Sequence, residues 1–230
     1  MTFSIAARCE RTGALGGAVS SSSIAVASRC LWGSPHGIVL TQNVTDPALG
    51  LIGLEWLATH HGADAALQMV RQARRHAEWR QLAVLDADGA SAWFSGAHTL
   101  GISAAVQGCD CVALGNMLAS PEVPATMTAA FEASGDLPLP TRLLVAMEAG
   151  LAAGGEMGPV HSIGLCVYLR EPWPVVDLRV DWSDSPIADL ARLWVAYEPQ
   201  MADYVLRATD PTRAPSYGVP GDVHATAGDE

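Results

Sequence analysis

Residues 1–19, MTFSIAARCERTGALGGAV, predict the two strands around which the rest of the fold is arranged. Residues 2–8 alternate apolar and polar side chains, as a half-buried strand does. TGALG then supplies a turn, and LGGAV resumes the extended pattern, so the two strands are expected to pair as a hairpin. The first strand therefore begins at Thr2, where chain ends are usually frayed.

This early start gives Thr2 two interpretations. Removal of Met1, which is common before a small residue, would leave the Thr2 hydroxyl beside a free α-amine, and that pair is a nucleophile with its own base. Such an amine has a reference pKa of about 7.7–8.0 and is partly neutral at pH 7. Alternatively, Thr2 is an ordinary strand residue, because Thr favours extended backbone.

Composition excludes several classes of function. The chain has 230 residues, half of them apolar, which suits one large domain or two small ones. A net charge of −11 without a long basic stretch disfavours nucleic acid as a partner. All 13 basic residues are Arg, so Schiff-base chemistry, a Walker A lysine and a Ser–Lys dyad are excluded.

Cysteine usage and the absence of targeting signals favour a cytoplasmic protein. The five cysteines have no disulfide-framework spacing, and we expect neither a signal peptide nor a membrane-spanning segment. Cys109 and Cys111 form a C-x-C pair, expected to be plain thiols, with thiol redox chemistry as a minor alternative. His60 and His61 have no companion ligand at useful spacing, so no metal or other cofactor is expected. Glu156 is expected to be solvated or paired with an Arg.

The order of the predicted elements indicates the fold class. Further strands are expected over 24–28, 36–44, 81–96 (a hairpin turning at Asp88-Gly89), 111–118, 161–169 and 176–182, and helices over 49–61, 63–76, 121–134, 140–154 and 185–208. Helices in pairs disfavour a parallel doubly wound sheet. We therefore predict an α+β fold with two antiparallel sheets between helix layers, a four-layer αββα sandwich, over residues 1–209. Residues 210–230 are expected to be an extended or disordered arm.

Eight segments resemble those of one known family in their amino-acid sequence and in their order along the chain. They are TFSIAAR, LGGAVSSSSIAVAS, GIVLTQNVTDPALGLIGLEWL, QLAVLDADG, ALGNMLASPEV, LLVAMEAGLAAGGE, DLRVDWSDSPIADLARL and APSYGVPGD. Over nearly the whole chain the sequence resembles the bacterial family called domain of unknown function 1028, classed with the N-terminal-nucleophile (Ntn) hydrolases, which include proteasome subunits. The resemblance implies an αββα fold with Thr2 as nucleophile. The resemblance places Ser22 where the family usually has a Lys. Activation of the Thr2 hydroxyl is then left to the α-amine alone, to Arg29 or to His36.

Three residues are the candidates for catalysis. Thr2 would attack the substrate. Ser21 follows a strand that should lie beside the first one, so its hydroxyl could serve the same site, or it could be a solvated hydroxyl at a polar strand end. Asn116 could stabilise a developing oxyanion through its amide, or it could cap a turn.

Three further residues are candidates for substrate binding. Gln42 and Asn43 end a buried strand and would either read the substrate amide or be satisfied polar groups. His36 lies in a turn after Ser34-Pro35 and could act as an acid or base.

The expected activity is hydrolysis of a non-peptide C–N bond in a small-molecule amide through a Thr2 acyl-enzyme. The alternative is a non-catalytic binding or accessory protein of the same fold. Large apolar side chains indicate a homodimer or larger homo-oligomer, because exposed aromatic patches mark interfaces; the tryptophans concerned are Trp32, Trp56, Trp93, Trp173, Trp182 and Trp194.

Overall fold

The structure, a computed structural model, describes residues 1–59 and 62–222. By its internal contacts the chain divides into two compact units, Met1–Trp194 and Val195–Glu230. The first unit thus ends inside the last helix, α6 (Pro186–Thr209), and a domain of residues 1–209 stays a prediction. The predicted helix end at His60 and His61 and the last part of the predicted arm, 223–230, lie outside the described residues.

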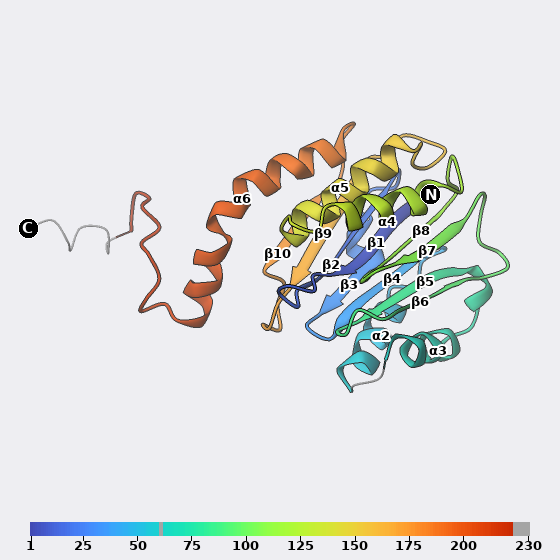
Figure 1. The fold of residues 1–230 in the computed structure, drawn as a ribbon, viewed down its shortest axis with the longest axis horizontal. Coiled ribbons are helices and arrows are strands. Elements are labelled where there is room, and N and C mark those ends of the chain that lie inside the picture. Colours follow the sequence, from blue (N-terminus) through green and yellow to red (C-terminus); the bar gives the residue numbers. More distant parts are fainter. Residues whose placement is uncertain (60–61, 223–230) are drawn as a thin grey trace, which may run out of the picture. The chain divides into compact units, whose positions relative to one another are not determined.

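Two antiparallel sheets form the centre of the first unit (Figure 1). The first sheet has the order β10-β9-β2-β1-β8-β7, with the strands β1 (Thr2–Arg8), β2 (Leu15–Ser21), β7 (Ala104–Gly108), β8 (Cys111–Asn116), β9 (Ser162–Tyr168) and β10 (Val176–Val180). The second has the order β3-β4-β5-β6, with β3 (Leu31–Ser34), β4 (Gly37–Asn43), β5 (Arg80–Asp86) and β6 (Ser91–Ser95). The predicted α+β class with two antiparallel sheets is confirmed, and β1 is a central strand paired on both sides.

Helices cover the outward faces of the two sheets. α2 (Ala48–Ala58) and α3 (Ala63–Ala73) pack against the second sheet, and α4 (Val123–Ala133) and α5 (Leu139–Ala152) pack against the first (Figure 1). Two short helices, α1 (Ala27–Cys30) and the 3-10 turn η1 (Ala77–Trp79), complete the described helical elements with α6.

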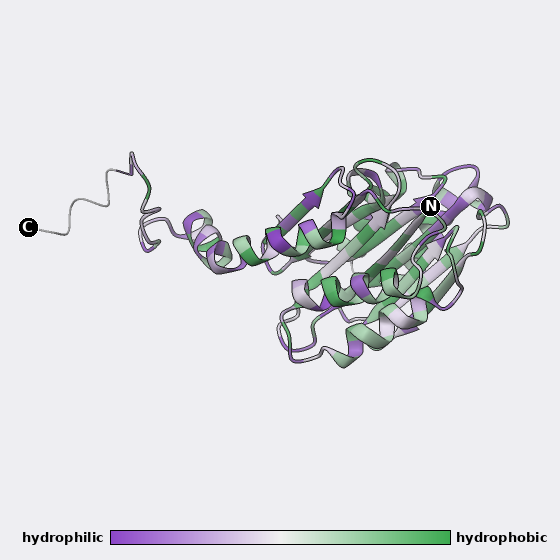
Figure 2. Ribbon diagram, turned by 90° about the horizontal axis from the view of Figure 1, so that it is seen from above, coloured by the Kyte–Doolittle hydropathy of each residue, from purple (hydrophilic) through white to green (hydrophobic). Residues whose placement is uncertain are grey.

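The strand sequences explain this arrangement, because the inner strands are apolar on both faces. In β4, Ile38 and Leu40 pack toward the first sheet, whereas Val39 between them packs toward α2 and α3. A short continuous apolar run is what a strand buried on both sides requires. The central strands are accordingly hydrophobic along most of their length (Figure 2).

The structure corrects the prediction in three places. The expected strand over 24–28 is instead a turn, with Ala25 at φ +52°, followed by α1. The chain must cross here from β2 in the first sheet to β3 in the second, and this crossing outweighs the strand preference of IAVAS. The strands β3 and β7 were not predicted; both are short edge strands whose residues are mostly half-buried, so their apolar pattern is weak.

A close backbone approach at Gly96 gives a stability prediction. A Cβ on Gly96 would lie 2.2 Å from the Glu78 carbonyl oxygen and 2.7 Å from that of Ala77. Because backbone atoms cannot swing aside, we expect Gly96→Ala to lower the free energy of unfolding by about 1–3 kcal/mol. Gly135→Ala is the matched control, since its nearest such neighbour is 3.7 Å away. Equal urea midpoints for the two variants would contradict the prediction.

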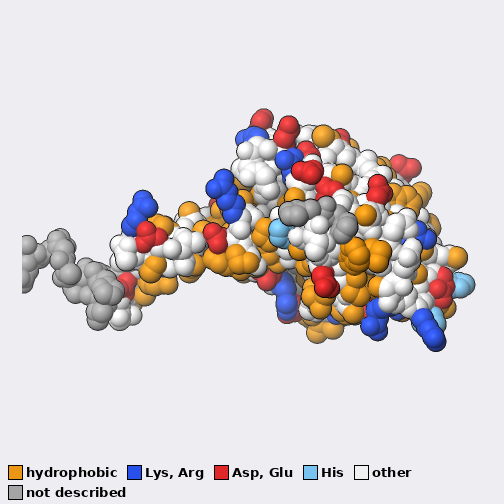
Figure 3. All heavy atoms as spheres, turned by 90° about the horizontal axis from the view of Figure 1, so that it is seen from below, with side chains coloured by type: hydrophobic (Ala, Val, Ile, Leu, Met, Phe, Trp, Pro, Cys, Tyr) orange, Lys and Arg blue, Asp and Glu red, His pale blue; other side chains and the backbone are white. Residues whose placement is uncertain are grey.

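The surface shows no large single-sign charged region on the face drawn in Figure 3, where hydrophobic side chains lie among acidic and basic ones. Trp32 and Trp56 pack against the core beneath α2 and α3, and Trp194 is buried. Trp93 and Trp182 are 42% and 58% exposed. These two are the tryptophans best placed for the predicted oligomer contact. Within residues 1–59 and 62–222, no helix has the length and apolar character needed to cross a membrane.

Candidate active site

Strand register brings the three predicted catalytic residues together. Thr2 lies directly opposite Asn116 in the β1–β8 pair, so their side chains share a face with Cβ atoms about 5 Å apart. On the other side of β1, Phe3 pairs with Ser20, which places Ser21 at the Thr2 end of β2. The shared face is the one between the sheets, because Ser4, two residues along β1, bonds to Gln42 of the second sheet. Thr2 is only 5% exposed there.

Two hydroxyl groups converge on one carbonyl oxygen at this end of β1. Ser21 Oγ donates to the Met1 carbonyl oxygen (2.6 Å), and Thr2 Oγ1 donates to the same atom. A carbonyl group in the position of the Met1 carbonyl therefore accepts a hydrogen bond from Ser21 Oγ as well as from Thr2 Oγ1.

The Ser21 hydroxyl ends a hydrogen-bonded chain that begins at a positive charge. Arg29 Nη2 donates to Ser23 Oγ (2.9 Å), and Ser23 Oγ lies 2.9 Å from Ser21 Oγ. Since Ser21 gives its proton to the Met1 carbonyl, Ser23 is the donor in this pair. The Ser23 amide also donates to Ser21 Oγ (3.1 Å). Both donations make Ser21 a stronger donor, because hydrogen bonds in a chain polarise one another.

A buried polar chain ties the site to the second sheet. Ser4 Oγ donates to Gln42 Oε1 (2.7 Å), Gln42 Nε2 to Gln81 Oε1 (2.8 Å), and Asn116 Nδ2 to the same Gln81 oxygen (3.1 Å). All four side chains are fully buried. Gln42, a candidate for binding substrate, is therefore a satisfied polar group within the described residues that holds the two sheets in register.

Asn116 has one unused polar atom. Its Oδ1 is buried and accepts no hydrogen bond from any described residue, while its Nδ2 is engaged by Gln81. An orphaned buried acceptor costs free energy.

The other two predicted substrate-binding residues lie apart from this group. Asn43 adopts φ +73°, and its side chain fastens surrounding backbone, donating to the Trp79 carbonyl (2.6 Å) and accepting from the Leu100 amide (3.1 Å). It is a structural turn residue. His36 is exposed and precedes β4, about 20 Å along that strand from Gln42. Of the two side chains that could replace the missing Lys, the structure brings Arg29 to the site and leaves His36 away from it.

One site residue, Glu156, was not predicted. It is 4% exposed, not solvated, and neither carboxylate oxygen has a hydrogen bond of ordinary geometry to any residue in 1–59 or 62–222. Burial raises its pKa, opposed by Ser22 and by the positive Met1 amine. Burial in turn lowers the pKa of that amine, opposed by Glu156. Glu156 is thus the carboxylate that opposes the lowering of the terminal amine's pKa.

The five cysteines are free thiols that differ in burial. Cys111 is buried, and burial raises its pKa to about 12, so its thiolate form is suppressed. Cys109 is exposed, and all five thiols are free. Across the described part of the chain, no group of three or more His, Cys, Asp or Glu side chains is placed to hold a metal ion.

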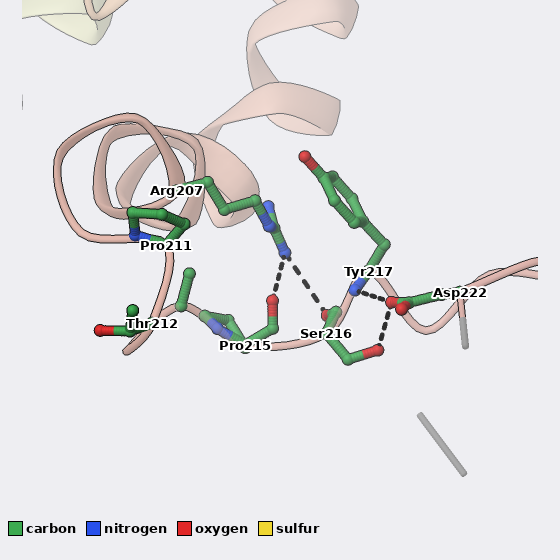
Figure 4. Close-up of a pocket in the computed structure, with 8 residues that line it drawn as sticks. Arg207, Pro211, Thr212, Pro215, Ser216, Tyr217 and Asp222 are labelled. Atoms are coloured by element: carbon green, nitrogen blue, oxygen red, sulfur yellow. Dashed lines mark hydrogen bonds between the residues drawn. The ribbon is translucent and has the colours of Figure 1, made fainter. Parts of the chain in front are cut away.

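A hollow in the second unit lies within residues 207–222 (Figure 4). The Arg207 guanidinium lies over the Tyr217 ring (3.9 Å) and donates to the Pro215 carbonyl (3.2 Å). Asp222 accepts from the Ser216 hydroxyl (2.5 Å) and the Tyr217 amide (2.7 Å). These groups are engaged with one another, so we assign the candidate site to Thr2 and its neighbours.

These features define an α+β protein with two antiparallel sheets and a Thr, a Ser and an Asn gathered at one end of its central strands. The chain belongs to the family described as "Family of unknown function (DUF1028)", which matches residues 2–190. Its structure is similar to the crystal structure of protein SPO2555 from Silicibacter pomeroyi, of the same family, with a TM-score of 0.81, 32% identity, and 88% and 92% of the two chains covered. Anbu from Hyphomicrobium sp. strain MC1 gives a TM-score of 0.38 at 13% identity, covering 88% of this chain and 97% of that one. No curated protein matches the sequence.

Proposed function

We propose that this protein is an N-terminal-nucleophile amidohydrolase with the four-layer αββα arrangement of that superfamily, acting on a small amide. The observation that carries the proposal is the convergence of the Thr2 and Ser21 hydroxyls on one carbonyl oxygen. An acyl group beside the Thr2 hydroxyl would find its oxygen already provided with a donor.

The chemistry requires only this chain's own residues and water. Once the chain ahead of Thr2 is removed, the free Thr2 amine takes the proton of Oγ1, and Oγ1 forms a bond to the substrate carbonyl carbon. Ser21 donates a hydrogen bond to the oxyanion. The second donor is Asn116 Nδ2, through the hydrogen that it does not give to Gln81. The C–N bond then breaks, and the leaving nitrogen takes the proton held by the Thr2 amine. Water cleaves the resulting ester, which releases a carboxylic acid and restores the Thr2 hydroxyl.

A matched pair of proteins tests the proposal. One is released from a cleavable amino-terminal fusion with Thr2 first, and the other with Met1 first, each checked by intact mass. We expect only the form that begins at Thr2 to hydrolyse members of a library of small amides, since Met1 both blocks the amine and fills the site. Equal activity of the two forms would sink the mechanism.

A second candidate is a non-catalytic accessory protein of the same fold. Met1 lies in the site with its carbonyl held by two hydroxyls, and a chain that keeps Met1 has no free Thr2 amine. Quantitative retention of Met1 in protein isolated from its own cells would favour this candidate.

A further inference from the structure

Met1 occupies the site as an acyl group would. In the chain, the Met1 carbonyl carbon is bonded to the Thr2 nitrogen as an amide. In an acyl-enzyme carrying a methionyl group, the same carbon would be bonded to the neighbouring Thr2 Oγ1 as an ester. Three parts of Met1 have separate surroundings: the carbonyl, the side chain and the α-amine. Each of them indicates what the acyl part of a substrate would meet once Met1 is gone.

The carbonyl and the side chain have defined positions. Ser21 donates to the carbonyl oxygen at 2.6 Å. The Met1 side chain runs beside Gly158, where an added Cβ would lie 3.5 Å from the Met1 Cε and 3.7 Å from its Sδ. Gly158 therefore leaves room for an unbranched apolar side chain at van der Waals distance.

The α-amine is the part of Met1 on which a carboxylate acts, because Glu156 opposes the lowering of its pKa. Glu156 precedes Gly158 in a segment fixed by backbone hydrogen bonds, from Ala119 N to the Gly155 carbonyl (3.0 Å) and from Met157 N to the Met117 carbonyl (2.9 Å). Both Glu156 oxygens are buried without a hydrogen bond of ordinary geometry among the described residues. The groups that act on this carboxylate are Ser22, the terminal amine and His161. A buried carboxylate without well-formed hydrogen bonds is costly unless a cation lies close to it.

We propose that the space held by Met1 is a subsite for an α-aminoacyl group, in which Glu156 binds the ammonium, Ser21 the carbonyl oxygen and the surface at Gly158 an unbranched apolar side chain. The inference rests on the proposed function and deepens it, since it names the substrate class: small amides of apolar α-amino acids with a free amino group. Removal of Met1 shifts the chain's own amine one residue back, to Thr2, so the ammonium that serves Glu156 must come from the substrate.

The test uses two probes that differ only in the α-amino group: methionine para-nitroanilide and its analogue without that group. The proteins begin at Thr2 by intact mass and are the wild type, Glu156→Gln, and Glu122→Gln as a control at an exposed Glu. We expect the wild type to prefer the amine-bearing probe. Glu156→Gln should lower kcat/KM for that probe by about 10- to 100-fold, mainly through KM, and leave the other probe unchanged.

Two results would overturn the inference. One is an equal loss on both probes, which would mean that Glu156 serves the Thr2 amine or the fold. The other is a wild type with no preference between the probes.

A binding measurement separates this inference from the proposed function. Calorimetry with methioninamide on Thr2→Ala protein, which lacks the nucleophile, should show binding that Glu156→Gln abolishes. Such binding without hydrolysis of either probe by the wild type would leave the subsite standing and refute the hydrolase. Absence of binding to a folded Thr2→Ala protein would refute the subsite.

Discussion

Thr2→Ala is expected to lower kcat for amide hydrolysis by at least about 10⁴-fold, because it removes the atom that forms the acyl-enzyme. The substituted alanine would still follow a removable Met1 and would still suit the buried start of β1, where Thr2 is 5% exposed. The loss should therefore appear in activity and leave the melting temperature within a few degrees of the wild type. The measurement is steady-state hydrolysis of an amide found in the library screen.

Thr2→Ser is the matched variant, since it keeps both the hydroxyl and the amine. We expect it to retain part of the activity, and both active forms should gain rate as pH rises through the pKa of the terminal amine. Burial lowers the pKa of the Met1 amine from 8.0, and the same cause should act on an amine at the more deeply buried Thr2. The rising limb is thus expected below pH 8. Thr2→Ala protein that hydrolyses the substrate at the wild-type rate would end the proposal.

Ser21→Ala is expected to produce the second-largest loss, about 10²- to 10³-fold in kcat, with KM much less affected. The reason is that Ser21 Oγ donates to the carbonyl position at 2.6 Å and is itself polarised by Ser23. Single-turnover measurements would place the loss in the acylation step.

Two companion variants separate donation from packing. Ser23→Ala and Arg29→Gln leave the Ser21 hydroxyl in place and remove its support, so they should cause a smaller loss in kcat in the same step. Asn116→Ala tests the predicted oxyanion amide: a loss similar to that of Ser21→Ala supports that role, whereas an active but less stable protein makes Asn116 a structural residue of the buried polar chain. Ser21→Ala protein with unchanged kcat would remove Ser21 from the mechanism.

Strand register explains why part of the site could be predicted from sequence. Thr2 begins a strand, Ser21 ends the next strand of the hairpin and Asn116 ends a third, so adjacent antiparallel strands bring all three to one edge. The order of the elements, with helices in pairs between runs of strands, also suffices to predict two antiparallel sheets. These features depend on local periodicity, which a sequence carries directly.

The other parts of the site depend on how loops pack against the sheets. Local sequence patterns do not predict this packing. Glu156 lies in a Gly-rich segment that resembles a solvated turn, yet it is 4% exposed and bridges to Leu118. Arg29 reaches Ser23 because the segment predicted as a strand is a turn followed by α1. Gln42 and Asn43 are neighbours in sequence, yet one points into the polar chain between the sheets and the other fastens surface backbone.

The half-buried position of Met1 has a practical consequence for how this protein is handled. An affinity tag or linker fused ahead of Thr2 would run through the space that Met1 fills beside Gly158, and it would convert the Thr2 amine into an amide. Under the proposed function, enzyme screens on protein purified by such a tag are expected to record no turnover, whatever substrate is supplied. Tags placed after the last residue, or removed to leave Thr2 first, avoid this false negative.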